Sequence, residues 1–116
     1  MKPRVRTLTK KDVAKKVADD HDERLYHTTR WVDATFTALR DMMLNSQEEI
    51  RIEIRDFGVF EVKLTRPKPK ARNPKTGDTV YIPWRKKTHF KPSKLIRESL
   101  QQPLTDTEVR EIMEEE

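Results

Sequence analysis

A turn inside the most basic part of the chain constrains the fold more than any other feature. Residues 63 to 94 contain eleven lysines and arginines but one acid, Asp78. The centre of this stretch, residues 72–78, reads Arg-Asn-Pro-Lys-Thr-Gly-Asp. Pro74 presets φ for the second position of a turn, and Gly77 supplies the left-handed residue that closes it. The pattern predicts the tip of a β-hairpin.

The run before this tip alternates with a period of two. Its bases are Arg66, Lys68, Lys70 and Arg72. This spacing predicts a strand with one wholly cationic face. Pro67 and Pro69 lack N–H donors, which a two-stranded ribbon tolerates on its unpaired edge. We expect residues 63–83, termed the arm, to form a self-repelling ribbon that becomes ordered on a polyanion.

Composition predicts one domain with a thin core, because the 116 residues are 34% hydrophobic and 39% charged. Burial against a second copy would enlarge that core. The formal charge is +5, but the signs are segregated along the chain. Residues 1–16 hold seven bases and one acid, whereas residues 101–116 hold one base and six acids. We call residues 1–8 the lead-in, which we expect to be flexible, and residues 101–116 the tail.

Several functions are excluded by what the sequence lacks. It has no cysteine, and glycine occurs only at positions 58 and 77, so thiolate chemistry and a phosphate-cradling loop are absent. His21 and His27 lie near carboxylates, but at no recognised metal-ligand spacing. We therefore expect no enzyme activity, no cofactor and no metal. No apolar run approaches the ~20 residues that span a bilayer, so we expect a soluble intracellular protein without membrane contact.

The first half of the chain predicts two helices followed by a strand. Thr9 and Asp12 resemble an N-cap arrangement for a helix over about residues 10–19. Apolar residues at helical spacing predict a second, longer helix, and they are Val32, Phe36, Leu39 and Met43. Residues 50–55 alternate between isoleucine and charge, as in a half-buried strand. The apolar phase changes after Gly58, which predicts a bulge or a sharp bend there.

The second half returns from the arm and ends in short helices. Residues 80–82 favour a return strand, and residues 84–91 form a third extended segment. We interpret Trp84 as a packing residue in preference to a base-stacking one. Ser93 is a plausible helix cap, and Thr105 with Glu108 forms a capping box for an amphipathic acidic helix reaching Glu116.

This order of elements closely resembles the bacterial histone-like HU and integration host factor family over about residues 9–100. The motifs that carry the resemblance are Asp-Phe-Gly-Val-Phe-Glu-Val at 56–62, Arg-Asn-Pro-Lys-Thr-Gly-Asp at 72–78, Ile-Pro at 82–83 and Phe-Lys-Pro-Ser-Lys at 90–94. The resemblance implies an α+β fold in an intertwined homodimer, with a helical base, a β-sheet saddle and two long β-hairpin arms. It also implies that the arms reach around double-stranded DNA through the minor groove.

The resemblance further implies roles for individual residues. Pro74 would be the wedge that enters a base step, with Arg72 and Asn73 beside it in the groove. A rigid ring can open a step at a cost of a few kcal/mol, and the bend brings more cations to phosphates. The predicted DNA-binding residues are Arg66, Lys68, Lys70, Arg72, Asn73, Pro74, Lys75, Arg85, Lys86, Lys87, Lys91, Lys94, Arg97 and Lys10.

The sequence departs from the family pattern in several places. Asp22 and Asp56 stand where the family usually has glycine, and the connection over residues 45–49 looks longer than usual. The arm carries one extra residue before the tip. The lead-in and the tail lie outside the common domain.

Three functions follow as hypotheses. The first is a nucleoid-associated cytoplasmic protein that bends and compacts DNA with little sequence preference, because minor-groove contacts separate A·T from G·C only weakly. The second is a site-selective bender like integration host factor, and in either case a heterodimer with a paralogue is open. The third is an interaction protein whose tail docks on basic arms or recruits a partner. In a milder form, Glu108, Glu111 and residues 114–116 compete with DNA for the basic surface.

Overall fold

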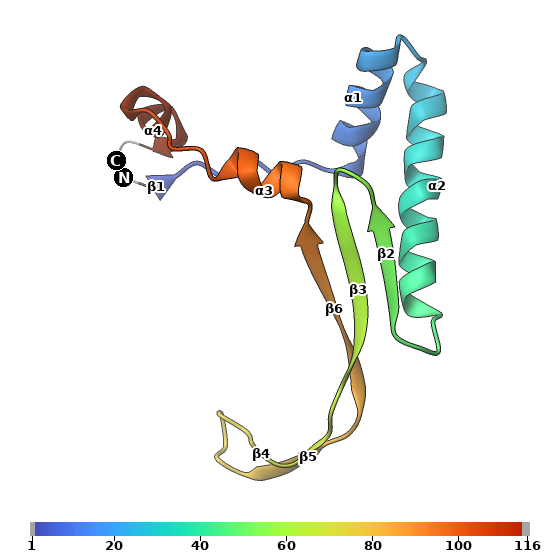
Figure 1. Cartoon of the computed structure of the whole chain (residues 1–116), viewed down its shortest axis with the longest axis vertical. Coiled ribbons are helices and arrows are strands. Elements are labelled where there is room, and N and C mark those ends of the chain that lie inside the picture. The colour runs from blue at the N-terminus through green and yellow to red at the C-terminus, as the bar shows by residue number, and fades with distance from the viewer. Residues whose placement is uncertain (1, 115–116) are drawn as a thin grey trace. The chain divides into compact units, whose positions relative to one another are not determined.

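A computed structural model describes residues 2–114 and shows an α+β chain (Figure 1). Its elements in order are β1 (Lys2–Pro3), α1 (Lys10–His21), α2 (Leu25–Leu44), β2 (Ile50–Ile54), β3 (Gly58–Thr65), β4 (Lys68–Arg72), β5 (Thr79–Ile82), β6 (Arg85–Pro92), α3 (Lys94–Leu100), α4 (Asp106–Ile112) and β7 (Met113–Glu114). They divide into one unit of Met1–Asn45 with Gln102–Glu116, and another of Ser46–Gln101. Within the described range, no helix has the length and apolarity that crossing a membrane requires.

The first unit contains the two predicted helices, α1 and α2, packed side by side (Figure 1). Ala14 and Ala18 are buried where they meet, and the Thr28 hydroxyl donates a hydrogen bond of 2.9 Å to the Ala14 carbonyl. The Asp12 carboxylate accepts a 2.7 Å bond from the Thr9 N–H, which lowers the pKa of Asp12. This contact confirms the predicted cap. Asp22 ends α1 in the left-handed region, at φ 51°.

From Gln102 onward the tail belongs to the same unit, and it contains the predicted capping box. Thr105 accepts from the Glu108 N–H at 3.2 Å, and Glu108 accepts from the Thr105 N–H at 3.0 Å. The helix α4 is shorter than predicted, because it ends at Ile112 and β7 follows. The last residues of the predicted helix, 115–116, lie outside the described range. Strand β7 pairs in antiparallel fashion with β1 of the lead-in.

The second unit is built on an antiparallel sheet of order β2-β3-β6. Its central strand pairs along its full length with β6, from Gly58 opposite Pro92 to Thr65 opposite Arg85. Directly opposed residues share a face of a sheet. One face therefore carries the apolar side chains, which are Ile50, Ile52, Ile54, Phe60, Val62, Leu64 and Phe90.

Strands β2 and β3 form a tight hairpin at the position where the apolar phase changes. Their register is continuous from Ile50 opposite Val62 to Ile54 opposite Gly58, so the predicted bulge is wrong and the sharp bend is confirmed. Phe57 lies in the turn, which Asp56 completes at φ 63°. Val59 lies on the polar face. The phase of the apolar alternation changes because a turn separates β2 from β3, and not because the register slips within one strand.

Gly58 lies in a crowded position under an aromatic cluster. The Phe60 and Phe90 ring centroids are 4.7 Å apart, and Phe57 lies 5.5 Å from Phe90. A Cβ atom on Gly58 would lie 2.5 Å from the Lys91 carbonyl oxygen and 2.7 Å from the Phe90 ring. The position therefore requires glycine because of space. Helix α3 is joined to this corner by the N–H of its N-cap residue Ser93, which donates to the Phe57 carbonyl at 2.9 Å.

The predicted helix cap at Ser93 is confirmed. Its side chain accepts a hydrogen bond of 3.3 Å from the Ile96 N–H, at the start of α3. The cap and the Phe57 contact fix where α3 begins relative to the β2–β3 turn.

Candidate nucleic-acid interface

The face of the sheet opposite the apolar one is polar and carries more bases than acids, and we call it the basic face. The register places ten residues on it, which are Arg51, Glu53, Val59, Glu61, Lys63, Thr65, Arg85, Lys87, His89 and Lys91. Lys63 lies directly opposite Lys87. Like charges in such a pair repel each other, so an anion bound between them would be stabilising.

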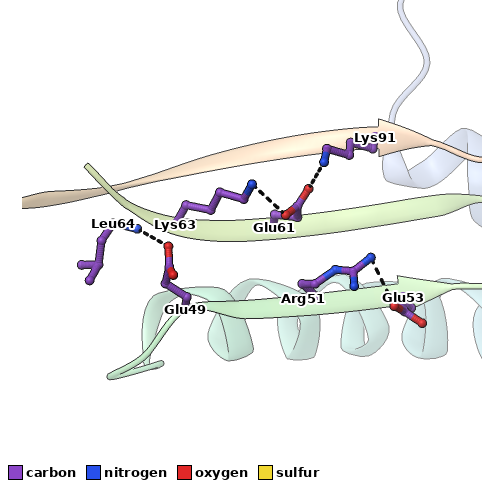
Figure 2. Close-up of polar contacts among 7 residues, drawn as sticks. All are labelled: Glu49, Arg51, Glu53, Glu61, Lys63, Leu64 and Lys91. Carbon is purple, nitrogen blue, oxygen red and sulfur yellow. Dashed lines mark hydrogen bonds and ion pairs between the residues drawn. The ribbon is translucent and has the colours of Figure 1, made fainter. Parts of the chain in front are cut away.

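Glu61 is the one covered acid on the basic face, with 5% of its surface exposed. Its carboxylate lies 2.9 Å from the Lys91 ammonium and 3.2 Å from that of Lys63 (Figure 2). The hydrogen bond from Lys91 lowers the pKa of Glu61, and this effect outweighs desolvation. Glu61 therefore holds two lysines from neighbouring strands in position while it neutralises part of their charge.

Two further acids act at the edge of the same sheet. Glu53 pairs with Arg51 at 3.3 Å, and both side chains are exposed (Figure 2). Glu49 immediately precedes β2, and its carboxylate accepts a 3.0 Å hydrogen bond from the Leu64 N–H. The bond satisfies a donor of β3 that has no partner strand on that side.

The arm continues the β3–β6 hairpin, but its ladder is interrupted (Figure 1). Pairing stops at Thr65 opposite Arg85 and resumes at Lys68 opposite Ile82. The register is the same on both sides, so Pro67 lies opposite Pro83. Neither proline has an N–H to donate, and the ladder has a gap where both strands lack donors.

A bulge beyond this gap corrects the predicted face pattern of the arm. The register shifts by one residue between Lys68 and Ala71, with the extra residue in β4. Lys68 therefore shares a face with Ile82, whereas Arg72 shares the opposite face with Thr79. The prediction that all four bases lie on one face is wrong, because the bulge reverses the alternation. The bulge lies before the tip, where the family resemblance predicts one extra residue.

The predicted hairpin tip is confirmed, and its backbone is held by four local hydrogen bonds. The Asn73 N–H donates to the Asp78 carbonyl at 2.8 Å, and the Gly77 N–H donates to the Asn73 carbonyl at 2.7 Å. The Asn73 side chain accepts from the Lys75 N–H at 2.9 Å, and Thr76 accepts from the Asp78 N–H at 3.3 Å. Gly77 has φ 75°, as the turn requires. Asn73 is thus partly occupied in shaping the tip.

The residues of the tip differ in solvent exposure. Asn73 is half-buried, whereas Pro74 projects in an exposed position beside it. The exposed basic side chains of the arm before and within the tip are those of Lys63, Arg66, Lys68, Lys70, Arg72 and Lys75.

The remaining predicted contacts are distributed over several elements. Arg85, Lys87 and Lys91 lie together on the basic face, whereas Lys86 points to the other face and donates to the Ser46 carbonyl. Lys10 is in the other unit.

Three predicted contacts lie on helices. Lys94 and Arg97 are exposed on α3, where Lys94 lies 3.7 Å from Glu98. Lys10, at the start of α1, is ion-paired with Asp33, whose pKa that contact lowers.

Two bases of the basic face, Arg51 and Lys63, were missed as candidate contacts. Arg51 alternates with isoleucines in the predicted half-buried strand, outside the basic stretch of residues 63–94. The sequence does place Lys63 on a polar face, because Glu61 and Lys63 alternate with Phe60 and Val62. Strand pairing was needed to show that these residues continue one surface with Arg85, Lys87 and Lys91.

A cationic sheet face that extends into an exposed basic β-ribbon defines the class of β-ribbon proteins that bind nucleic acid. Residues 8–101 match the family described as "Bacterial DNA-binding protein". The chain therefore belongs to this family, whose members are DNA-binding proteins and not enzymes, in agreement with the prediction from sequence.

Individual relatives agree with this assignment. The chain is 35% identical over 92 residues to integration host factor subunit beta of Herminiimonas arsenicoxydans, covering 78% of this chain and 87% of that protein. It is 36% identical over 92 residues to the same subunit of Aeromonas hydrophila, covering 78% and 94%. Its fold matches the Anabaena HU–DNA cocrystal structure with a TM-score of 0.68 and 22% identity, over 83% of this chain and all of that one.

Proposed function

We propose that the protein is an architectural DNA-binding protein that binds and bends double-stranded DNA as a dimer. The observation that carries this proposal is the basic face of the sheet, together with the exposed bases of the arm that continues the same hairpin and the exposed proline at its tip. Phosphates neutralise such a surface and replace the repulsion between its cations. Bending would serve chromosome compaction, with the protein associated with the nucleoid in the cytoplasm.

The apolar surface of the single chain supports the dimer. Among the described residues, no large side chain is fully buried, and the buried apolar residues are Ala14, Ala18 and Val62. Trp31 is 66% exposed and Met42 54% exposed on α2. So much apolar surface in a small chain marks an interface. A second copy supplies the missing core, in keeping with the intertwined dimer that the family resemblance implies.

The exposed tip supports minor-groove insertion at Pro74. An apolar wedge between base steps kinks DNA, and the bend brings the basic face closer to phosphates. Arg72, Lys75 and the other arm bases would follow the backbone on both sides of the wedge, while Lys91 and Lys94 contact phosphates from the sheet and α3. Asn73 would reach the groove with the part of its side chain that the tip leaves free.

Sequence preference separates two versions of this proposal. We favour binding with little sequence preference, because the arm offers mostly cations, which contact phosphates and do not read bases. Relatives named integration host factor subunit beta favour the alternative, a site-selective bender. Competition between random duplexes and duplexes selected by the protein distinguishes them. A specificity ratio near one supports the first version, and a ratio of about 10³ or more supports the second.

The salt dependence of affinity tests the common mechanism. If roughly six to ten phosphates are contacted, the association constant falls by about 10³ to 10⁵ between about 50 and 200 mM salt. Fluorescence anisotropy with a labelled duplex measures it. An affinity that does not change with salt would contradict the proposal.

A second candidate function is an interaction protein in which the tail, not DNA, is the principal partner of the basic segments. The specific observation in its favour is the pairing of β7 with β1, which joins the acidic tail to the basic lead-in. Salt-sensitive DNA binding by the full chain favours the first proposal. No salt-sensitive DNA binding, together with retained self-association through the tail, favours the interaction protein.

A further inference from the structure

The lead-in and the tail contact each other although both lie almost wholly outside the region that matches the family. Lys2 lies opposite Glu114 and Pro3 lies opposite Met113 in the β1–β7 pair. The Arg4 N–H donates to the Ile112 carbonyl at 2.7 Å, which extends this pairing by one residue. The contact is therefore specific in register.

Proline at position 3 fits this register. Antiparallel pairs alternate between hydrogen-bonded and non-hydrogen-bonded types. Because Arg4 and Ile112 form a bonded pair, Pro3 and Met113 form a non-bonded one, where no N–H is needed. The lead-in thus carries its donor-free residue at a position where it does not weaken the strand.

The lead-in presents three exposed cations at alternate positions. Lys2, Arg4 and Arg6 are all exposed, while Val5, which alternates with them, is 89% exposed. No acid whose side chain the structure describes forms an ion pair with any of the three. Exposed lysines and arginines bind the phosphate oxygens of nucleic acids.

The tail brings negative charge close to this segment, with which it pairs through its backbone. Arg4, Val5, Arg6, Glu111 and Ile112 line one open hollow. Glu111 therefore brings a negative charge to the hollow that both arginines line. Contact between lead-in and tail is made through two short strands, and pairs of this size are marginally stable in water. A polyanion with many charges can displace such a tail.

We infer that residues 2–6 are a further phosphate-binding segment, and that the tail occupies this segment in the free protein and leaves it when DNA binds. The inference rests on the proposed DNA binding and adds a second contact region to it. The tail makes the segment selective, because only a dense polyanion outcompetes it. The alternative, a tail that orders the lead-in for DNA, is opposed by Glu111, whose charge repels phosphates from Arg4 and Arg6.

A reversible covalent lock tests the inference in the full chain. The protein has no cysteine, so Pro3→Cys with Met113→Cys introduces a single pair at directly opposed positions. The Cα separation of such a pair falls within the range of about 4.4–6.8 Å that a disulfide spans. Anisotropy with a random-sequence duplex then compares the oxidised and reduced forms of the same molecule.

We expect the reduced form to bind about tenfold more tightly than the oxidised form near 50 mM salt. Its slope of log affinity against log salt should be steeper by about two to three, near 0.9 for each phosphate gained. Equal affinity of both forms, with DNA binding intact, would overturn the inference and leave the proposed function standing. Tighter binding by the oxidised form would show that the tail is a scaffold. Absence of DNA binding by the wild-type protein would refute both the inference and the proposed function.

A charge variant gives an independent reading without a disulfide. Glu111→Gln removes the carboxylate beside Arg4 and Arg6 and should tighten binding about two- to fourfold at low salt. The matched control is Glu23→Gln, an exposed acid in the turn between α1 and α2. An equal effect of both substitutions would mean that net charge alone is responsible, which would contradict a local competitor.

Discussion

The sheet and the arm are built from the same two chain segments, yet they differ in every feature that makes a strand pair rigid. In the sheet, β3 and β6 pair without a break, pack aromatic rings on one face and hold two lysines with Glu61 on the other. In the arm, the ladder has a proline gap and a bulge, and its one acid is Asp78. Rigid pairing positions cations for phosphates, whereas loosened pairing lets a ribbon follow a groove.

The two glycines give the largest test of this difference. Gly58→Ala should destabilise the protein by about 1–3 kcal/mol, because its Cβ would overlap backbone and the Phe90 ring. Gly77→Ala meets nothing within 4 Å and strains only its own φ of 75°, so its effect should stay local to the tip. Thermal unfolding at one fixed protein concentration measures both. An equal fall in Tm would mean that the tip belongs to the cooperative core.

The proline gap can be closed to make the arm resemble the sheet. Pro67→Thr with Pro83→Thr restores two N–H donors at opposed positions, each worth about 1 kcal/mol if its bond forms. Amide exchange in β4 and β5 should then slow, and DNA bending should weaken more than affinity. Pro69→Thr, inside the bulge, is the matched control. Unchanged exchange in the double variant would show that the gap has another cause.

Glu61 can be altered to make the sheet resemble the arm. Glu61→Gln frees Lys63 and Lys91 from their counter-ion, so the salt slope of DNA binding should steepen by about one. Glu53→Gln, which removes an exposed partner of Arg51, should change the slope less. An unaltered slope for Glu61→Gln would mean that these lysines do not contact phosphate.

The same carboxylate makes stability depend on pH. The pKa of Glu61 is lowered in the folded chain from its ordinary 4.5, so its contribution to stability is fully present above that pH. It is lost as pH falls from 4.5 through the folded pKa, because the unfolded state binds the proton first. Unfolding of Glu61→Gln should therefore show a weaker loss of stability over this acidic window than wild type. Parallel curves of stability against pH for the two proteins would contradict a contribution of these ion pairs to stability.

Strain at the β2–β3 turn should produce the smallest effect. Asp56→Gly relieves a left-handed residue at φ 63° but increases the freedom of the unfolded chain, for a net gain of about 0.5 kcal/mol. Asp22→Gly, at φ 51° after α1, is its counterpart in the other unit. A loss of stability in either variant would indicate that the aspartate side chain contributes something that its backbone angle does not reveal.

Local signals in the sequence predicted most elements, and pairing signals were harder to read. The caps at Ser93 and Thr105 and the tip at Pro74 were correct because each depends on neighbouring residues. The face pattern of the arm was wrong because one extra residue in β4 acts only through its partner strand. The lysine pair around Glu61 and the contact between lead-in and tail depend on residues far apart in the chain, which periodicity does not connect.

DNA bending by the tip tests the central claim most directly. Single-pair FRET on a duplex of about 35 base pairs would compare wild type with Pro74→Ala at two salt concentrations. We predict strong, salt-sensitive bending by wild type and a much smaller bend by the variant, with affinity reduced less than bending. Tight binding by wild type without bending, or equal bending by Pro74→Ala, would contradict the wedge and the arm mechanism built on it.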